Sequence, residues 1–174
     1  MLGFLSKIFG GSKSEKDVKQ IQPLVDKINQ FFQQYQSLSN DELRNNTQLF
    51  RARIKAKLEN IDAEIANQKN AAEALTADQL TEKDAIYRQI DELIKDRDKQ
   101  IEEVLMELLP EAFATIKEAA RRFKENTSLV SKATELDRNL AGRGKQYITI
   151  EGENAIFQNT WTAAGGTVTW NMVH

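Results

Sequence analysis

The segment closest to a phosphate-binding loop lies near the C-terminal end. Residues 142–145 read Gly-Arg-Gly-Lys, and a phosphate loop uses such backbone N–H groups and such a lysine to hold phosphates. That loop also needs a glycine five residues before the Gly-Lys pair and a Ser or Thr after the lysine for Mg²⁺. Asn139 and Gln146 occupy those two positions, so the segment does not predict a nucleotide site.

Other residue types that carry chemistry are absent or scattered. The chain has no cysteine, and its one histidine is His174, which excludes cysteine nucleophiles, histidine triads and multi-histidine metal sites. The charged run at residues 91–99 mixes both signs over a few helical turns, as a solvated helix face does. We therefore predict no catalytic residue, no cofactor-binding residue and no metal site.

Composition favours a cytoplasmic, helix-rich chain of one domain, or of one domain with an appendage. The 174 residues are 40% hydrophobic and 29% charged, with a formal net charge of -2. Such a chain, without aromatic residues interleaved among its basic ones, is not expected to bind nucleic acid. No apolar run reaches the roughly 18–20 residues of a membrane span, and the opening residues lack the basic start and cleavage site of a signal peptide.

The first 20 residues predict a short amphipathic helix with a basic flank. The positions that carry this pattern are Leu2, Phe4, Leu5, Lys7, Ile8 and Phe9, then Lys13, Lys16 and Lys19 after a Gly-Gly-Ser hinge. Four lysines against Glu15 and Asp17 give residues 1–20 a local charge of +2. This pattern is typical of a helix that docks on an anionic membrane surface or on a partner. It fits equally a helix folded onto its own domain, and the residues leave both readings open.

The next helix is expected to start at Ser14, which with Asp17 resembles a capping box. From residue 18 to residue 35 the apolar positions step by three or four, which predicts a face packed against another helix. Pro23 is expected to kink this helix or to mark its true start.

Residues 40–109 predict two long helices that form an antiparallel hairpin. Ser39 and Glu42 make a capping box at the start of the first arm, and residues 76–78 read as the turn. Each arm of some 30 residues is about 45 Å long. The arms are expected to meet through Ile61 and Ile65 on one side and Ile86, Ile90, Leu93, Ile94 and Ile101 on the other. One continuous helix paired with a second copy of the chain is the alternative.

Pro110 is expected to end the second arm and to begin another helix, with a buried stripe that includes Phe113, Ile116 and Phe123. Residues 126–146 are polar, with a short helix around 135–141. A β-hairpin follows at 147–158 and a third strand at 167–170. The predicted fold is mainly α: a long antiparallel helical hairpin and amphipathic helices, with a small C-terminal antiparallel β-hairpin or meander.

Two segments resemble a known family. Residues 38–53, LSNDELRNNTQLFRAR, and residues 109–122, LPEAFATIKEAARR, are similar to early segments of SecA, the motor ATPase of bacterial preprotein translocation. The opening MLGFLSKIFG also resembles the N-terminus of that family. The resemblance covers residues 1–58 and 108–124, and it identifies the chain as an N-terminal SecA fragment that ends before the nucleotide-binding motifs.

The chain departs from the plainer members of the family in two places. About 45 residues separate the two matching segments, where only a few are usual, and residues 126–170 look like a second insertion. We therefore expect three regions: residues 1–12 as N-terminal helix and hinge, 13–125 as a helical region with the inserted hairpin at 60–107, and 126–174 as loop and β insertion. The last region would lead towards the missing nucleotide-binding domain.

The resemblance implies a role in docking rather than in catalysis. In the family the N-terminal region contacts acidic phospholipid and the SecY channel complex and contributes to some dimer interfaces. The implied parent is an ATPase that uses ATP and Mg²⁺, moves secretory preproteins and lies peripherally on the cytoplasmic face of the inner membrane. The alternative is a free-standing cytosolic helical scaffold whose hairpin binds a partner helix.

Overall fold

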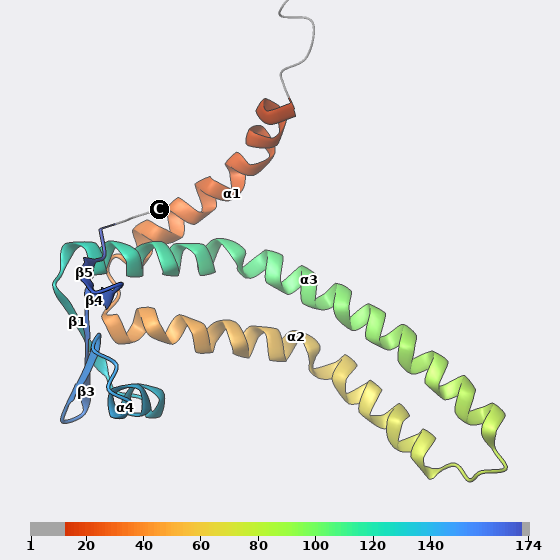
Figure 1. The fold of residues 1–174 in the computed structure, drawn as a ribbon. Coiled ribbons are helices and arrows are strands. Elements are labelled where there is room, and N and C mark those ends of the chain that lie inside the picture. Colours follow the sequence, from red (N-terminus) through yellow and green to blue (C-terminus); the bar gives the residue numbers. More distant parts are fainter. Residues whose placement is uncertain (1–12, 172–174) are drawn as a thin grey trace, which may run out of the picture. The chain divides into compact units, whose positions relative to one another are not determined.

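The computed structural model describes residues 13–171. Within them the chain forms four α-helices and five β-strands, in the order α1, α2, α3, β1, α4, β2, β3, β4, β5 (Figure 1). They fall into two compact units, one formed by Arg44–Ala112 and the other by the described residues on either side of that stretch. The predicted fold class is confirmed. The predicted region boundaries at residues 12 and 125 stay predictions, and residues 1–12 lie outside the described residues.

Helix α1 runs from Lys13 to Tyr35 with Pro23 inside it. Ser14, the predicted cap, lies inside the helix as described, and Pro23 does not mark the start of the helix. An internal proline costs about 3 kcal/mol because it removes one backbone hydrogen bond and crowds the preceding turn. The second half of α1 offsets this cost by packing Ile28 and Phe32, which are half-buried.

Helix α2 runs from Asn40 to Ala74 and begins at the predicted capping box. The backbone N–H of Ser39 donates to Oε2 of Glu42 at 2.7 Å, and the N–H of Glu42 donates to Oγ of Ser39 at 3.2 Å. These reciprocal bonds satisfy two N–H groups that the first helical turn leaves without partners.

Within the unit Arg44–Ala112, α2 and the first part of α3 (Leu80–Glu125) lie antiparallel as the two arms of a hairpin (Figure 1). The turn falls where it was predicted. The N–H of Gln79 donates to the carbonyl of Thr76 at 3.1 Å, and the Thr76 hydroxyl lies 2.5 Å from Oδ1 of Asp78. The prediction of a hairpin within the chain is therefore confirmed.

The two arms meet in an aliphatic cluster. Leu58, Ile61, Ile65 and Ile90 are buried, and Ile54, Ile86, Leu93 and Ile101 pack around them. Ile94 is the exception among the predicted contacts, because its side chain is 39% exposed.

Ion pairs repeat the antiparallel order along the hairpin. Arg53 pairs with Glu111 at 2.5 Å, Lys57 with Glu103 at 3.3 Å, and Asp62 with Arg97 at 2.5 Å. From one ion pair to the next, the residue number of the α2 partner rises while that of the α3 partner falls. This order is possible only if the two arms run antiparallel. Each exposed pair contributes about 0–1 kcal/mol, so the pairs set the register more than they stabilise the hairpin.

Pro110 does not end the second arm, because α3 continues through it to Glu125. The prediction of two helices separated at this proline was wrong. The residues around it, Glu107, Leu108, Leu109, Glu111 and Ala112, are good helix formers. Because Pro110 and Leu108 are buried, packing offsets the lost backbone hydrogen bond.

The C-terminal strands form two small antiparallel sheets. The first has the order β1-β3-β2 (Ser128–Lys132, Asn154–Gln158, Ile148–Glu151), and the second pairs β4 with β5 (Thr160–Ala163, Gly166–Thr169). The predicted hairpin is the β2–β3 pair, and the predicted short helix is α4 (Glu135–Gly142).

Two strands differ from the prediction. Residues 128–132 were expected to be polar loop, yet β1 pairs Ser128 with Gln158 and Lys132 with Asn154. The third predicted strand pairs with β4 rather than with the hairpin, across a two-residue turn in which Ala164 and Gly165 have φ angles of 50° and 79°. Such a left-handed turn matches the twist of two adjacent strands and joins them locally.

Candidate functional site

Most of the predicted docking residues lie outside the described part of the chain. This holds for Leu2, Phe4, Leu5, Lys7, Ile8 and Phe9, so their role stays a prediction. Lys13, Lys16 and Lys19 fall in the first two turns of α1, and the side chains of Lys16 and Lys19 are exposed.

The first half of α1 carries an exposed apolar face. Val18, Ile21 and Val25 are 58%, 54% and 38% exposed, although their spacing predicted a face packed on another helix. The spacing of three and four residues places all three on one side of the helix. This face was not among the predicted docking residues, and it lies on the same helix as Lys16 and Lys19.

The second half of α1 is held in its unit by contacts from α3. Nζ of Lys117 donates to Oδ1 of Asn29 at 2.9 Å and lies 4.9 Å from the ring centroid of Phe32. Within α1 itself, the ring of Phe31 lies 6.0 Å from that of Tyr35. The helix is thus anchored at its C-terminal end, while its N-terminal half presents the apolar face.

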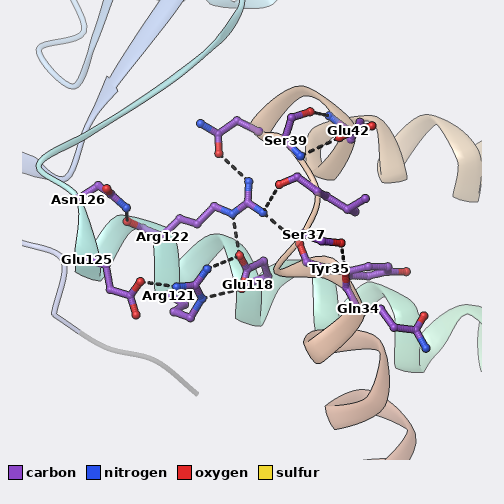
Figure 2. Close-up of polar contacts among 12 residues, drawn as sticks. Gln34, Tyr35, Ser37, Ser39, Glu42, Glu118, Arg121, Arg122, Glu125 and Asn126 are labelled. Atoms are coloured by element: carbon purple, nitrogen blue, oxygen red, sulfur yellow. Dashed lines mark hydrogen bonds and ion pairs between the residues drawn. The ribbon is translucent and has the colours of Figure 1, made fainter.

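A buried arginine joins the turn between α1 and α2 to α3 (Figure 2). Nη2 of Arg122 donates to the carbonyl oxygens of Tyr35 and Leu38 at 3.1 and 2.7 Å, and Nη1 donates to Oδ1 of Asn40 at 2.7 Å. Arg122 is only 8% exposed. Its planar guanidinium supplies several donors in a fixed fork, so one side chain satisfies three acceptors from one short turn.

Glu118 balances the charge of this arginine inside the unit. It is fully buried, and its Oε1 accepts from Nε of Arg122 at 2.7 Å and from Nη2 of Arg121 at 2.7 Å, while Oε2 accepts from Nε of Arg121 at 2.8 Å. Burial by itself would raise the pKa of Glu118, but the hydrogen bonds from Arg121 and Arg122 outweigh it and leave the pKa lowered. The carboxylate therefore stays ionised and holds both arginines.

The same turn is bonded to the strand β1. Nδ2 of Asn40 donates to the carbonyl of Val130 at 2.9 Å, and the N–H of Lys132 donates to Oδ1 of Asp41 at 2.7 Å. The sequence placed Glu118 at helical spacing from both arginines, but gave no sign that Asn40 and Asp41 meet a strand about 90 positions later. This polar cluster is structural support for α1, and none of its groups is arranged for acid–base chemistry.

The Gly-Arg-Gly-Lys segment follows the C-terminus of α4. The N–H groups of Arg143, Gly144 and Lys145 donate to the carbonyls of Asn139, Ala141 and Leu140 at 3.1, 2.9 and 3.3 Å. In a phosphate-binding loop, by contrast, backbone N–H groups at the N-terminus of a helix are left unpaired and point at the phosphate. These three groups are already engaged, so the segment lacks the geometry of a phosphate site.

An apolar groove of about 510 Å³ was not predicted from the sequence. One wall comes from α3 and the other from the strands, and its lining is Ile116, Ala119, Ala120, Phe123, Tyr147, Phe157, Gln158, Asn159, Trp161 and Trp170. The predicted buried stripe of α3 is only partly buried, because Phe113 and Ile116 are 54% and 68% exposed. The aromatic residues of the strands occur singly in the sequence, so nothing in their spacing predicts that they gather beside α3.

Neither a metal site nor a membrane span is found among residues 13–171. No group of three or more histidine, cysteine, aspartate and glutamate side chains there is placed to hold a metal ion. None of the helices in that stretch combines the length and the hydropathy that crossing a bilayer requires.

Comparison with known proteins connects these features to one family. The model of the SecA DEAD-like domain matches residues 5–132. The chain is 44% identical to the SecA protein translocase subunit of Christiangramia forsetii over 97% of its length, 44% identical to that of Amoebophilus asiaticus over 100%, and 41% identical to that of Porphyromonas gingivalis over 98%. It spans only 15% of the length of each relative. No solved structure matches the chain.

The family match includes the two segments on which the resemblance rested. It also includes the hairpin and β1, and the relatives align with the remaining strands as well. The chain therefore belongs to the SecA protein translocase family, of which it represents an N-terminal fragment.

Proposed function

We propose that this chain is the docking part of a SecA-type protein translocase and that catalysis resides elsewhere in the longer polypeptide. Its relatives are named protein translocase subunits, which supports a role in protein translocation. In this proposal the whole protein uses ATP and Mg²⁺ to move secretory preproteins through the SecY channel complex. It would work in the cytoplasm, at the inner face of the membrane.

The observation that carries the proposal is the exposed apolar face of α1. Val18, Ile21 and Val25 lie together on a helix whose other end is anchored. Burying an aliphatic side chain of this size contributes about 1.5–3 kcal/mol when it leaves water completely. Three such residues, together with the apolar positions among residues 1–12, support docking of α1 on a membrane surface or on the channel.

Charge contributes less than the apolar face within the described part of the helix. Residues 15–27 contain as many basic as acidic residues, so their net charge is zero. The basic ones are Lys16, Lys19 and Lys27, and the acidic ones are Glu15, Asp17 and Asp26. The basic excess comes from Lys7 and Lys13, each contributing on the order of 1 kcal/mol near an anionic surface. Binding is therefore expected to need acidic phospholipid but to lose only part of its strength in salt.

Flotation with liposomes tests the proposal. The chain is mixed with vesicles of phosphatidylcholine alone, or of phosphatidylcholine with phosphatidylglycerol, and the floating fraction is measured at low and high salt. We expect binding to the anionic vesicles, and a loss of most of it in the Ile21→Asp variant. Because Ile21 is 54% exposed, circular dichroism should show an unchanged helix content.

The matched control is Gln20→Asp, which introduces the same charge at the neighbouring exposed position. It lies on another side of α1, so it should keep most of the binding. Equal losses in both variants would reject the apolar face as the docking element. Equal binding to neutral and anionic vesicles would reject the proposal that docking requires acidic phospholipid.

A further inference from the structure

One side of α3 carries a line of exposed apolar side chains. Between residues 50 and 105, all of which the structure describes, the exposed large apolar side chains are Leu80 at 64%, Tyr87 at 46%, Ile94 at 39% and Leu105 at 47%. Their spacings of seven, seven and eleven residues are close to two, two and three turns of a helix, so all four lie on the same side of α3. Single exposed apolar residues are ordinary, whereas apolar residues that share one surface mark an interaction site.

An acidic flank runs beside this apolar line. An exposed aspartate follows each of its first three members by four residues, and these aspartates are Asp84, Asp91 and Asp98. A spacing of four residues places each carboxylate beside the apolar side chain that precedes it. The line therefore presents apolar and negative groups in the same repeating order along the arm.

The rest of the arm does not neutralise this flank. Residues 80–105 hold five basic and eight acidic side chains, a net charge of -3. Three of the basic side chains form their ion pairs with other carboxylates: Lys95 with Glu92, Lys99 with Asp96, and Arg97 with Asp62. The surface around the apolar line is consequently negative.

This charge decides which occupant fits the line. An acidic surface repels an anionic membrane and nucleic acid. In a symmetric dimer both copies contribute the same surface, so two apolar lines packed together would bring the aspartates of one copy beside those of the other, and like charges placed this close are destabilising. A helix with lysine or arginine beside its apolar face complements both features, as charged residues flanking the seam of a coiled coil do.

We propose that the apolar line of α3 is a docking site for an amphipathic helix of a partner protein, with basic side chains beside its apolar face. Leu80, Tyr87, Ile94 and Leu105 supply the apolar contact, and the acidic flank selects the charge of the partner. The site lies in the unit Arg44–Ala112. It does not depend on the docking of α1, so either proposal can fail alone.

Two synthetic helical peptides of about three heptads test the proposal. Both have leucine at the first and fourth heptad positions, and the fifth and seventh positions are lysine in one peptide and glutamate in the other. Binding of each labelled peptide to the full chain is measured by fluorescence anisotropy at physiological ionic strength. We expect the lysine peptide to bind about tenfold more tightly than the glutamate peptide.

Tyr87→Asp should weaken binding of the lysine peptide about tenfold, although the added negative charge attracts that peptide. The matched control is Gln89→Asp, at an exposed position on the opposite side of α3, and it should change the affinity less than about twofold. Circular dichroism should show the same helix content in both variants, because both positions are exposed.

Asp91→Lys tests the acidic flank and should weaken the lysine peptide about fivefold while strengthening the glutamate peptide. Glu107→Lys makes the same charge change at an exposed position on the opposite side of the helix, and it should leave the preference intact. Failure of the lysine peptide to bind, or equal losses in Tyr87→Asp and Gln89→Asp, would overturn the proposal. A dimer of the chain that Tyr87→Asp dissociates in analytical ultracentrifugation would also overturn it, because a second copy would then be the occupant.

Discussion

Nε of Arg122 donates to Oε1 of Glu118 at 2.7 Å, one helical turn earlier on α3, and both side chains are withdrawn from water. The pair lies under the turn that leads from α1 into α2, and the remaining donors of Arg122 bind that turn (Figure 2). The position of α1 in its unit therefore depends on a residue about 90 positions later in the sequence.

Arg122→Ala is expected to destabilise this unit by about 3 kcal/mol, because it removes a donor from the buried Glu118 and leaves partly buried acceptors in the turn without donors. Both tryptophans, Trp161 and Trp170, lie in the same unit, so urea unfolding followed by tryptophan fluorescence reports on it. Lys124→Ala, at an exposed position of the same helix, is the control and should change stability by less than about 0.5 kcal/mol. Equal effects of the two variants would contradict the role given to Arg122.

Acid should weaken the unit through Glu118. Its pKa is lowered in the folded chain because hydrogen bonds from Arg121 and Arg122 outweigh the cost of burial, so the unfolded chain, with an ordinary value of about 4.3, binds the proton more readily. The contribution to stability is therefore complete above that value and is lost as pH falls below it. Glu118→Gln should destabilise the unit clearly at pH 7 and much less at pH 3, measured by urea unfolding; an equal cost at both pH values would argue against an ionised Glu118.

The hairpin offers two identical substitutions with different expected effects. Ile90 is 3% exposed and belongs to the aliphatic cluster, whereas Ile94 is 39% exposed. Ile90→Ala should cost about 2–5 kcal/mol, because it removes buried methyl groups and leaves a cavity. Ile94→Ala should cost about 1 kcal/mol or less. Hydrogen exchange of residues 54–101 followed by mass spectrometry distinguishes them, and similar losses of protection would mean that the arms meet on another face.

Local signals in the sequence were sufficient for the helices and for the family. The capping box of Ser39 and Glu42, the turn at residues 76–78 and the aliphatic spacing of both arms each involve neighbours within a few positions, where helical geometry acts. The similarity at residues 38–53 and 109–122 is likewise a property of the printed residues, so both the hairpin and the SecA family were predicted correctly.

Local signals failed where a distant segment decides the outcome. Pro110 predicts a helix end by its own chemistry, but the packing and the helix formers around it keep α3 continuous. Val18 and Ile21 have the spacing of a buried stripe, yet spacing does not say whether a partner element faces the helix. Their exposure is a property of the tertiary structure.

The sequence by itself determined the helical hairpin, the β2–β3 pair and the family, since each depends on residues close together or on a linear pattern. Only the tertiary structure decided that β1 pairs with β3, that Arg122 holds the turn before α2, and that the two tryptophans share a groove with α3. These contacts join segments 22 or more positions apart along the chain. Loop closure over such distances costs entropy that no local propensity encodes, so they form only once the surrounding packing supplies the compensating contacts.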